Sequence, residues 1–169
     1  EKLGVFYLGK ALDPATGTLL AGRGIGSSGT LLADSLGVIE VLGPVTLGDS
    51  GAAAARVTAG GVLKTAALQL GANGTGAGRV DVEGAGSRLE VSGPLSLGGT
   101  SAGANGSGVL RVRDGGVVQT ITPFPDHLRI WGAGDTLAVG TGGSVVTFQQ
   151  IDVGGVLSME GGSISGAQR

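Results

Sequence analysis

This chain contains no cysteine, only three Phe, one Tyr and one Trp, and five prolines. The missing cysteine excludes disulfides, thiolate nucleophiles and cysteine-ligated metals. The aromatic residues are too few for the girdles of an outer-membrane barrel, and no stretch approaches the roughly 18 apolar residues of a membrane-spanning helix. The sequence therefore predicts no membrane insertion.

Charge and histidine are scarce as well. Charged residues make up 14% of the 169 residues and the net charge is −2, so no basic surface for nucleic acid is expected. The single histidine, His127, has neither a second histidine nor a cysteine with which to hold zinc. A Ser-His-Asp triad is disfavoured because His127 lies in a loop flanked by prolines. The sequence predicts no cofactor and no bound metal.

Glycine, by contrast, is abundant, with 37 residues, roughly three times the usual share of about 7%. These glycines follow no strict Gly-X-Y period, which excludes collagen. Disorder is excluded too, because 41% of the residues are hydrophobic and many Val, Leu and Ile alternate with polar residues, as in chains that bury apolar surface. No helical periodicity is present, so the sequence predicts an all-β fold.

One short motif recurs along the chain. Gly43-Pro44-Val45-Thr46-Leu47-Gly48 returns as Gly93-Pro94-Leu95-Ser96-Leu97-Gly98, with the shorter copy Leu68-Gln69-Leu70-Gly71 between them. The third residue of this Leu-x-Leu-Gly strand is read at Ala21, Leu47, Leu70, Leu97, Ile130 and Val153. Intervals of 23 to 33 residues between these markers indicate repeats with constant strands and loops of variable length.

Each repeat contains two further strands. The second strand places apolar residues around a residue expected to face solvent: Leu31-Leu32-Ala33, Ala55-Arg56-Val57, Val80-Asp81-Val82, Leu110-Arg111-Val112, Leu137-Ala138-Val139 and Leu157-Ser158-Met159. The third follows a turn of small residues: Val38-Ile39-Glu40-Val41, Val62-Leu63, Leu89-Glu90-Val91, Val117-Val118, Val145-Val146 and Ile164. Three short strands per repeat predict a parallel β-helix (β-solenoid) of about six coils of 23–33 residues, in which like strands stack about 4.8 Å apart. Residues 19–169 form these repeats, and residues 1–18 form an N-terminal cap or a strand donated to a neighbouring molecule.

The residues also resemble a known family. Leu68-Gln69-Leu70-Gly71, the glycine-rich loop at 72–78 and the strands up to Val91 are similar to the short repeats of autotransporter passenger domains, which belong to type V secretion. The likeness is best from Gly37 to Val118. It implies a right-handed helix of β-strands outside the cell, commonly serving adhesion or surface structure. Passengers are usually longer and carry a C-terminal barrel, so this chain is either a fragment or mature product, or a related protein that becomes long by stacking.

Some parallel β-helices are polysaccharide lyases or hydrolases, which raises the question of catalytic carboxylates. Asp81 and Glu83 lie two residues apart on one side of their strand, and Asp114 is within reach from a later coil. Charged residues are, however, common on the wet face of alternating strands. The stretch most similar to a calcium-binding repeat is Gly78-Arg79-Val80-Asp81, but it has arginine and valine where the calcium-binding pattern needs small residues. The sequence therefore predicts no enzyme.

One segment departs from the repeat and is a candidate interaction loop, because loops that leave a rigid scaffold often carry recognition. It occupies the longest interval between markers and contains Pro123, Phe124, Pro125, Asp126, His127 and Trp131. The alternative is a lateral loop in which Phe124 and Trp131 cover an edge of the core.

The function that these features favour is an extracellular structural or adhesive module that associates with itself end to end by stacking coil on coil. Cell-surface or host carbohydrate or protein is a second expected partner. The alternatives are a carbohydrate-active β-helix enzyme and a passive stalk that spaces another domain from the cell.

Overall fold

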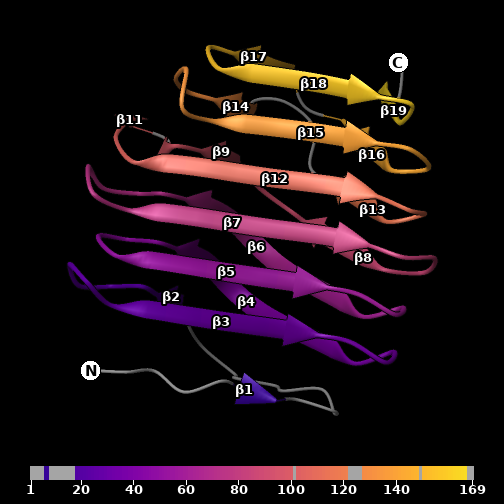
Figure 1. The fold of residues 1–169 in the computed structure, drawn as a ribbon, viewed down its shortest axis with the longest axis horizontal. Helices are drawn as coiled ribbons and strands as arrows, with labels where there is room; N and C mark the ends of the chain where they lie inside the picture. The colour runs from indigo at the N-terminus through magenta and orange to yellow at the C-terminus, as the bar shows by residue number, and fades with distance from the viewer. Residues whose placement is uncertain (1–5, 8–17, 101, 122–126, 149, 167–169) are drawn as a thin grey trace.

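The computed structural model describes residues 6–7, 18–100, 102–121, 127–148 and 150–166. These residues form an all-β parallel β-helix, as the repeats predicted, and it is right-handed, as the resemblance implied. It has about five turns, whereas the repeats predicted about six coils. The strands stack one above another from the N-terminal to the C-terminal end (Figure 1). The described residues contain no helix at all, and hence none that crosses a membrane.

One side of the solenoid is a parallel sheet of seven strands. Its strands, in spatial order, are β1 (Phe6–Tyr7), β3 (Ser28–Ala33), β5 (Ala52–Val57), β7 (Ala77–Glu83), β12 (Ser107–Arg113), β15 (Thr136–Gly140) and β18 (Val156–Glu160). This sheet faces the viewer in Figure 1. It contains the second strand of every predicted repeat, from Leu31 to Leu157, in the predicted register.

The remaining sides form a sheet of ten strands. They are β2 (Leu19–Ala21), β4 (Val38–Leu47), β6 (Val62–Leu70), β8 (Arg88–Val91), β9 (Leu95–Leu97), β13 (Val117–Thr120), β14 (His127–Ile130), β16 (Ser144–Thr147), β17 (Gln150–Val153) and β19 (Ser163–Gly166). Ala21 pairs with Leu47, and the pairing continues through the predicted markers to Val153. The third predicted strands likewise pair from Ile39 to Ile164.

Two features differ from the prediction of separate short strands. In β4 and β6 the third strand of one repeat continues through the corner into the Leu-x-Leu-Gly strand of the next, with a register irregularity between Val41 and Pro44. The sequence also did not predict the antiparallel pair formed by β10 (Gly99–Thr100) and β11 (Gly103–Ala104). Both differences arise where the loop length changes from one coil to the next, which alters the corner but leaves the stacked strands in place.

The core is a column of aliphatic side chains inside the coils. Leu47, Leu70 and Leu97 have no exposed surface, and Ile130 is 1% exposed. Alternation along each strand produces this result, because side chains at every second position point inward. Full burial of each such side chain stabilises the fold by roughly 1.5–3 kcal/mol.

One corner of the solenoid requires a left-handed backbone in every coil. The residue two positions before the third strand has a positive φ throughout, and in the later coils it is always glycine: Gly60, Gly86, Gly115, Gly142 and Gly161. Glycine adopts this conformation without a steric cost. In the first coil the same position is Leu36, with φ of 65° and a side chain that is 79% exposed.

Candidate functional site

The candidate interaction loop is only partly described. Pro123, Phe124, Pro125 and Asp126 lie outside the described residues, so their role remains a prediction. The backbone of His127 begins β14 and pairs with Gln150. Of the candidate residues, Trp131 alone can be placed with its side chain.

Trp131 packs within the solenoid wall. The guanidinium of Arg129 lies 5.1 Å from the centroid of its ring, and a side chain at Gly99 would come within 2.9 Å of the ring carbon Cδ1. The indole Nε1 is buried and has no hydrogen-bond partner in the described part of the chain. Trp131 therefore lies between Arg129 and the backbone at Gly99.

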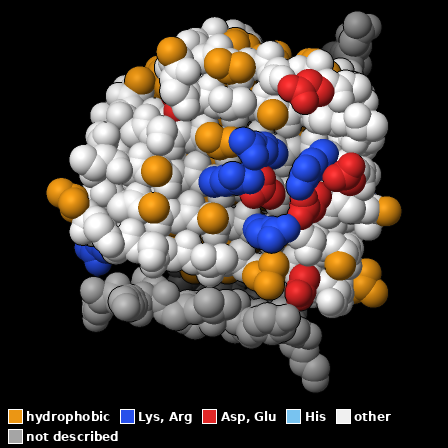
Figure 2. Space-filling model, in the orientation of Figure 1, with side chains coloured by type: hydrophobic (Ala, Val, Ile, Leu, Met, Phe, Trp, Pro, Cys, Tyr) orange, Lys and Arg blue, Asp and Glu red, His pale blue; other side chains and the backbone are white. Residues whose placement is uncertain are grey.

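The candidate carboxylates lie on the seven-stranded sheet, each beside arginine. Both oxygens of Asp81 accept hydrogen bonds from Arg79, at 2.7 and 2.9 Å. Glu83 accepts from Arg56 at 2.5 Å and from Arg113 at 2.6 Å. Figure 2 shows these charged side chains gathered near the centre of the face. The hydrogen bonds from Arg113 and then Arg56 lower the pKa of the Glu83 carboxyl from its usual value, so this group does not hold a proton for acid catalysis near neutral pH.

Asp114 does not complete an acid-base pair with these residues. Its carboxylate is 3.6 Å from Arg113 and its side chain is 64% exposed. In the stretch that resembles a calcium-binding repeat, residues 78–81, Arg79 donates hydrogen bonds to both carboxylate oxygens of Asp81, which a bound cation would need as ligands. The described residues contain no group of three or more His, Cys, Asp or Glu side chains arranged to hold a metal ion.

One serine, Ser101, lies in a sequence motif that is typical of nucleophilic catalysis. We expected no serine in the Gly-x-Ser-x-Gly motif of a nucleophile elbow, but Gly99-Thr100-Ser101-Ala102-Gly103 has this spelling. That motif needs a strand before the serine and a helix after it. Here the flanking residues form the antiparallel pair β10 and β11, and Ser101 lies outside the described residues.

The C-terminal coil exposes core positions. Val153, Leu157 and Met159 are 50%, 38% and 46% exposed, whereas their partners one coil earlier, Ile130, Leu137 and Val139, are at most 1% exposed. Among the described strands, β17, β18 and β19 each pair on one side only, and they form the yellow end of the solenoid (Figure 1). We call this surface the C-terminal face. Sequence periodicity marked these residues as inward-facing but did not reveal that they are uncovered.

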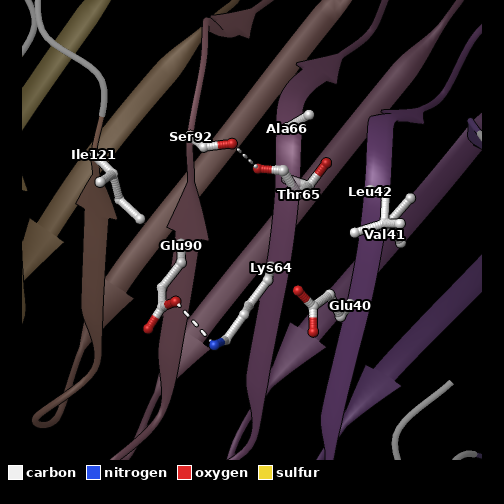
Figure 3. A pocket seen from close by; sticks show the side chains of 9 residues that line it. All are labelled: Glu40, Val41, Leu42, Lys64, Thr65, Ala66, Glu90, Ser92 and Ile121. Carbon is white, nitrogen blue, oxygen red and sulfur yellow. Dashed lines mark hydrogen bonds and ion pairs between the residues drawn. The ribbon is translucent and has the colours of Figure 1, made fainter. Parts of the chain in front are cut away.

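A hollow lies at the corner between the two ladders of the ten-stranded sheet. The large side chains of Leu42 and Ile121 stand on either side of it, and the smaller Ala66 and Ser92 lie between them (Figure 3). The hollow measures about 290 Å³, and its rim carries Glu40, Lys64 and Glu90, which occupy equivalent positions on β4, β6 and β8. We call it the corner notch. Its sequence signal was the recurrence of a charged residue at one position of the third strand.

Comparison with known protein families, with curated proteins and with solved structures found no match to this chain.

Proposed function

We propose that this chain is an extracellular structural or adhesive module that associates end to end with further copies of itself. The observation that carries the proposal is the C-terminal face. It combines three parallel strands that each pair on one side only among the described strands with the apolar side chains of Val153, Leu157 and Met159. Unpaired strand edges next to exposed apolar surface favour the addition of another strand layer.

The surface that fits this face best is another coil of the same protein. Within the chain, each coil stacks on the next with like residues in register, as Leu137 does on Leu157. At the opposite end, β1 and β2 each pair with a single neighbour among the described strands. A contact between opposite ends of two copies is heterologous, and repetition of such a contact produces an open filament.

The extracellular location rests on the resemblance of the repeats to autotransporter passenger domains. A passive stalk remains the alternative, because further coils of a longer chain would cover the C-terminal face in the same way. The carbohydrate-active alternative draws no support from Asp81 and Glu83, since arginines occupy both carboxylates. A protein or carbohydrate of the cell surface remains a second proposed partner.

The proposal is tested by sedimentation velocity and electron microscopy of the purified chain over a range of concentrations. We expect filaments that lengthen with concentration. Leu157→Glu places a charge in the centre of the C-terminal face and is expected to abolish assembly, because burial of an unpaired charge costs several kcal/mol.

Ile121→Glu is the matched control, since it introduces the same charge on an apolar side chain of similar exposure, 47%, directly after β13, which has a neighbouring strand on each side. This variant should assemble as the parent does. A monodisperse monomer at every concentration would refute end-to-end association, and so would equal assembly of Leu157→Glu and the parent.

A further inference from the structure

The corner notch results from the choice of residue at one corner of successive coils. In five successive coils the residue at this corner directly follows a set of residues that pair in register, at positions 41, 65, 91, 120 and 147. These corner residues form a ridge along the solenoid: Leu42, Ala66, Ser92, Ile121 and Phe148. Leu42, Ile121 and Phe148 are 56%, 47% and 43% exposed. The small side chains of Ala66 and Ser92 interrupt this ridge, and the gap that they leave is the notch.

The floor of the notch is held in place by hydrogen bonds. The Thr65 hydroxyl lies 2.9 Å from the carbonyl oxygen of Gly43 and 2.8 Å from that of Ala67. The Ser92 hydroxyl donates to the carbonyl of Thr65 at 3.4 Å. Thr65 is 4% exposed. The floor is therefore preorganised, which reduces the entropy lost when a ligand binds.

The rim offers both donors and acceptors of hydrogen bonds. Glu40, Lys64 and Glu90 follow one another on adjacent strands, which lie about 4.8 Å apart. Lys64 Nζ is 3.5 Å from Glu90 Oε2, so the ammonium retains room for another acceptor. The Glu40 carboxylate has no hydrogen-bond partner within the described part of the chain. It lies beside Lys64 on the side opposite to Glu90 (Figure 3).

This arrangement narrows the chemistry of the ligand. Glu90 is paired with Lys64 and also with Arg88, whose Nη1 lies 3.4 Å from Oε1. Neither sign of charge is in excess around the notch, because Glu40 repels an anion whereas Lys64 and Arg88 repel a cation.

An extended peptide fits poorly, because its side chains on one face repeat at about 6.6 Å whereas the rim groups repeat at about 4.8 Å. A sugar ring offers hydroxyl groups that both donate and accept, and its C–H edges suit the aliphatic walls of Leu42 and Ile121. A volume of about 290 Å³ lies just below the range for small-molecule sites, about 300–1,000 Å³, so the notch has room for one ring and not for a longer ligand.

We propose that the corner notch binds one pyranose ring of a neutral glycan. The ring lies on Ala66 and Ser92 between the walls of Leu42 and Ile121, and its hydroxyls bond to Glu40, Lys64 and Glu90. This site is on the side of the solenoid, so its occupation does not depend on end-to-end association. Because it is open to solvent and has no aromatic platform, the affinity for a single sugar is weak, in the millimolar range.

The test is a titration of the ¹⁵N-labelled chain, followed by NMR, with glucose, galactose, mannose and N-acetylglucosamine, and with glucuronic acid as the anionic comparison. We expect at least one neutral sugar to shift the amide resonances of Lys64, Ala66 and Ser92 in a saturable way. Glucuronic acid should bind at least tenfold more weakly. If no neutral sugar produces a saturable shift, or if glucuronic acid binds as well as the best neutral sugar, the proposal is wrong.

Two variants locate the site. Ser92→Leu fills the notch with the kind of side chain that Leu42 already presents at this corner, so the fold should be retained while binding falls at least tenfold. Glu40→Gln keeps the shape but removes a charged acceptor, and binding should fall several-fold because hydrogen bonds to charged groups are the stronger ones. Glu160→Gln, an equally conservative change on the seven-stranded sheet, is the control and should leave binding unchanged. Binding of the sugar by Ser92→Leu at the parent's affinity would overturn the assignment.

Discussion

Glu83 Oε2 accepts hydrogen bonds from Arg113 Nε and Nη2 at 3.0 and 2.6 Å, although the two residues are 30 positions apart in the chain. They are register partners on the adjacent strands β7 and β12. From the other side, Arg56 on β5 reaches Oε1 of the same carboxylate at 2.5 Å. One carboxylate thus joins three successive coils on the outer surface of the seven-stranded sheet.

This contact makes part of the stability dependent on pH. Hydrogen bonds from Arg113 and then Arg56 lower the pKa of the Glu83 carboxyl in the folded chain from its ordinary value. Its stabilising contribution is therefore complete above the unfolded-state pKa and is lost as the pH falls through the folded-state pKa. Glu83→Gln should lower the free energy of unfolding by about 0.5–1 kcal/mol at pH 7 and should weaken the fall in stability below about pH 4.5.

Urea denaturation between pH 3 and pH 7 measures this effect. Glu160→Gln is the control, because Glu160 contacts the hydroxyl of Ser158 rather than an arginine. The control should follow the parent curve with pH. Parallel curves for the parent and Glu83→Gln would contradict the assigned role of Glu83.

Asp135 is a buried carboxylate that ties one coil to the preceding one. It is 2% exposed, and its two oxygens accept hydrogen bonds from the amides of Gly108 and Gly132, each at 2.8 Å. Asp135→Ala leaves both amides without this partner in the interior, and each such loss costs about 1–3 kcal/mol. We expect a destabilisation of about 2–4 kcal/mol by chemical denaturation. Asp49→Ala, which removes a hydrogen bond to exposed Asn73, should cost less than about 1 kcal/mol, and equal losses for the two variants would refute this prediction.

Leu36 has a left-handed backbone with φ of 65°, at a corner position where the other coils have glycine. A left-handed conformation costs a residue with a side chain roughly 1–2 kcal/mol, and Leu36 is 79% exposed, so it recovers little through burial. Leu36→Gly should therefore raise the free energy of unfolding by about 0.5–1 kcal/mol, after allowance for the greater freedom of glycine in the unfolded chain. Ile25→Gly, at an exposed position without a positive φ, should not stabilise. A lower melting temperature for Leu36→Gly than for the parent would be inconsistent with strain at this corner.

Gly71 marks a close approach of two backbone segments. It has φ of +67°, and a Cβ at this position would lie 2.1 Å from the carbonyl oxygen of Ser107. Gly71→Ala should destabilise the chain by about 3 kcal/mol or more, because conformational strain and overpacking act together. A Cβ at Gly74 would have no atom within 4 Å, so Gly74→Ala should change the free energy of unfolding by less than about 0.5 kcal/mol. Similar melting curves for the two variants would disprove the close approach.

Much of the fold could be predicted from short-range patterns. The strand positions and the register from Ala21 to Val153 agree with the structure, because the alternation of inward and outward side chains is a property of the local backbone. The same alternation identified the core residues. It did not anticipate the pair of β10 and β11, since such a pairing depends on how a longer loop folds back on itself.

The candidate sites were less predictable. Asp81 and Glu83 were recognised as neighbours on one face, but their arginine partners include Arg56 and Arg113 from other coils. The row of Glu40, Lys64 and Glu90 was not recognised either, although a charged residue recurs at one position of the third strand in these coils. Loop lengths differ from coil to coil, so the distance in sequence between contacting residues is irregular, and no fixed spacing reveals which charges meet.

The sequence by itself determined that the chain is a β-solenoid and which side of each strand faces the core, since both follow from period-two alternation and the recurrence of Leu-x-Leu-Gly. Tertiary structure alone decided which residues of different coils lie together and which inward-facing side chains are covered. Leu137 and Leu157 have the same place in their repeats, yet one is fully buried and the other is 38% exposed. The reason is physical: a side chain inside a solenoid is buried by the coils above and below it, and Leu157 has a described coil on one side only.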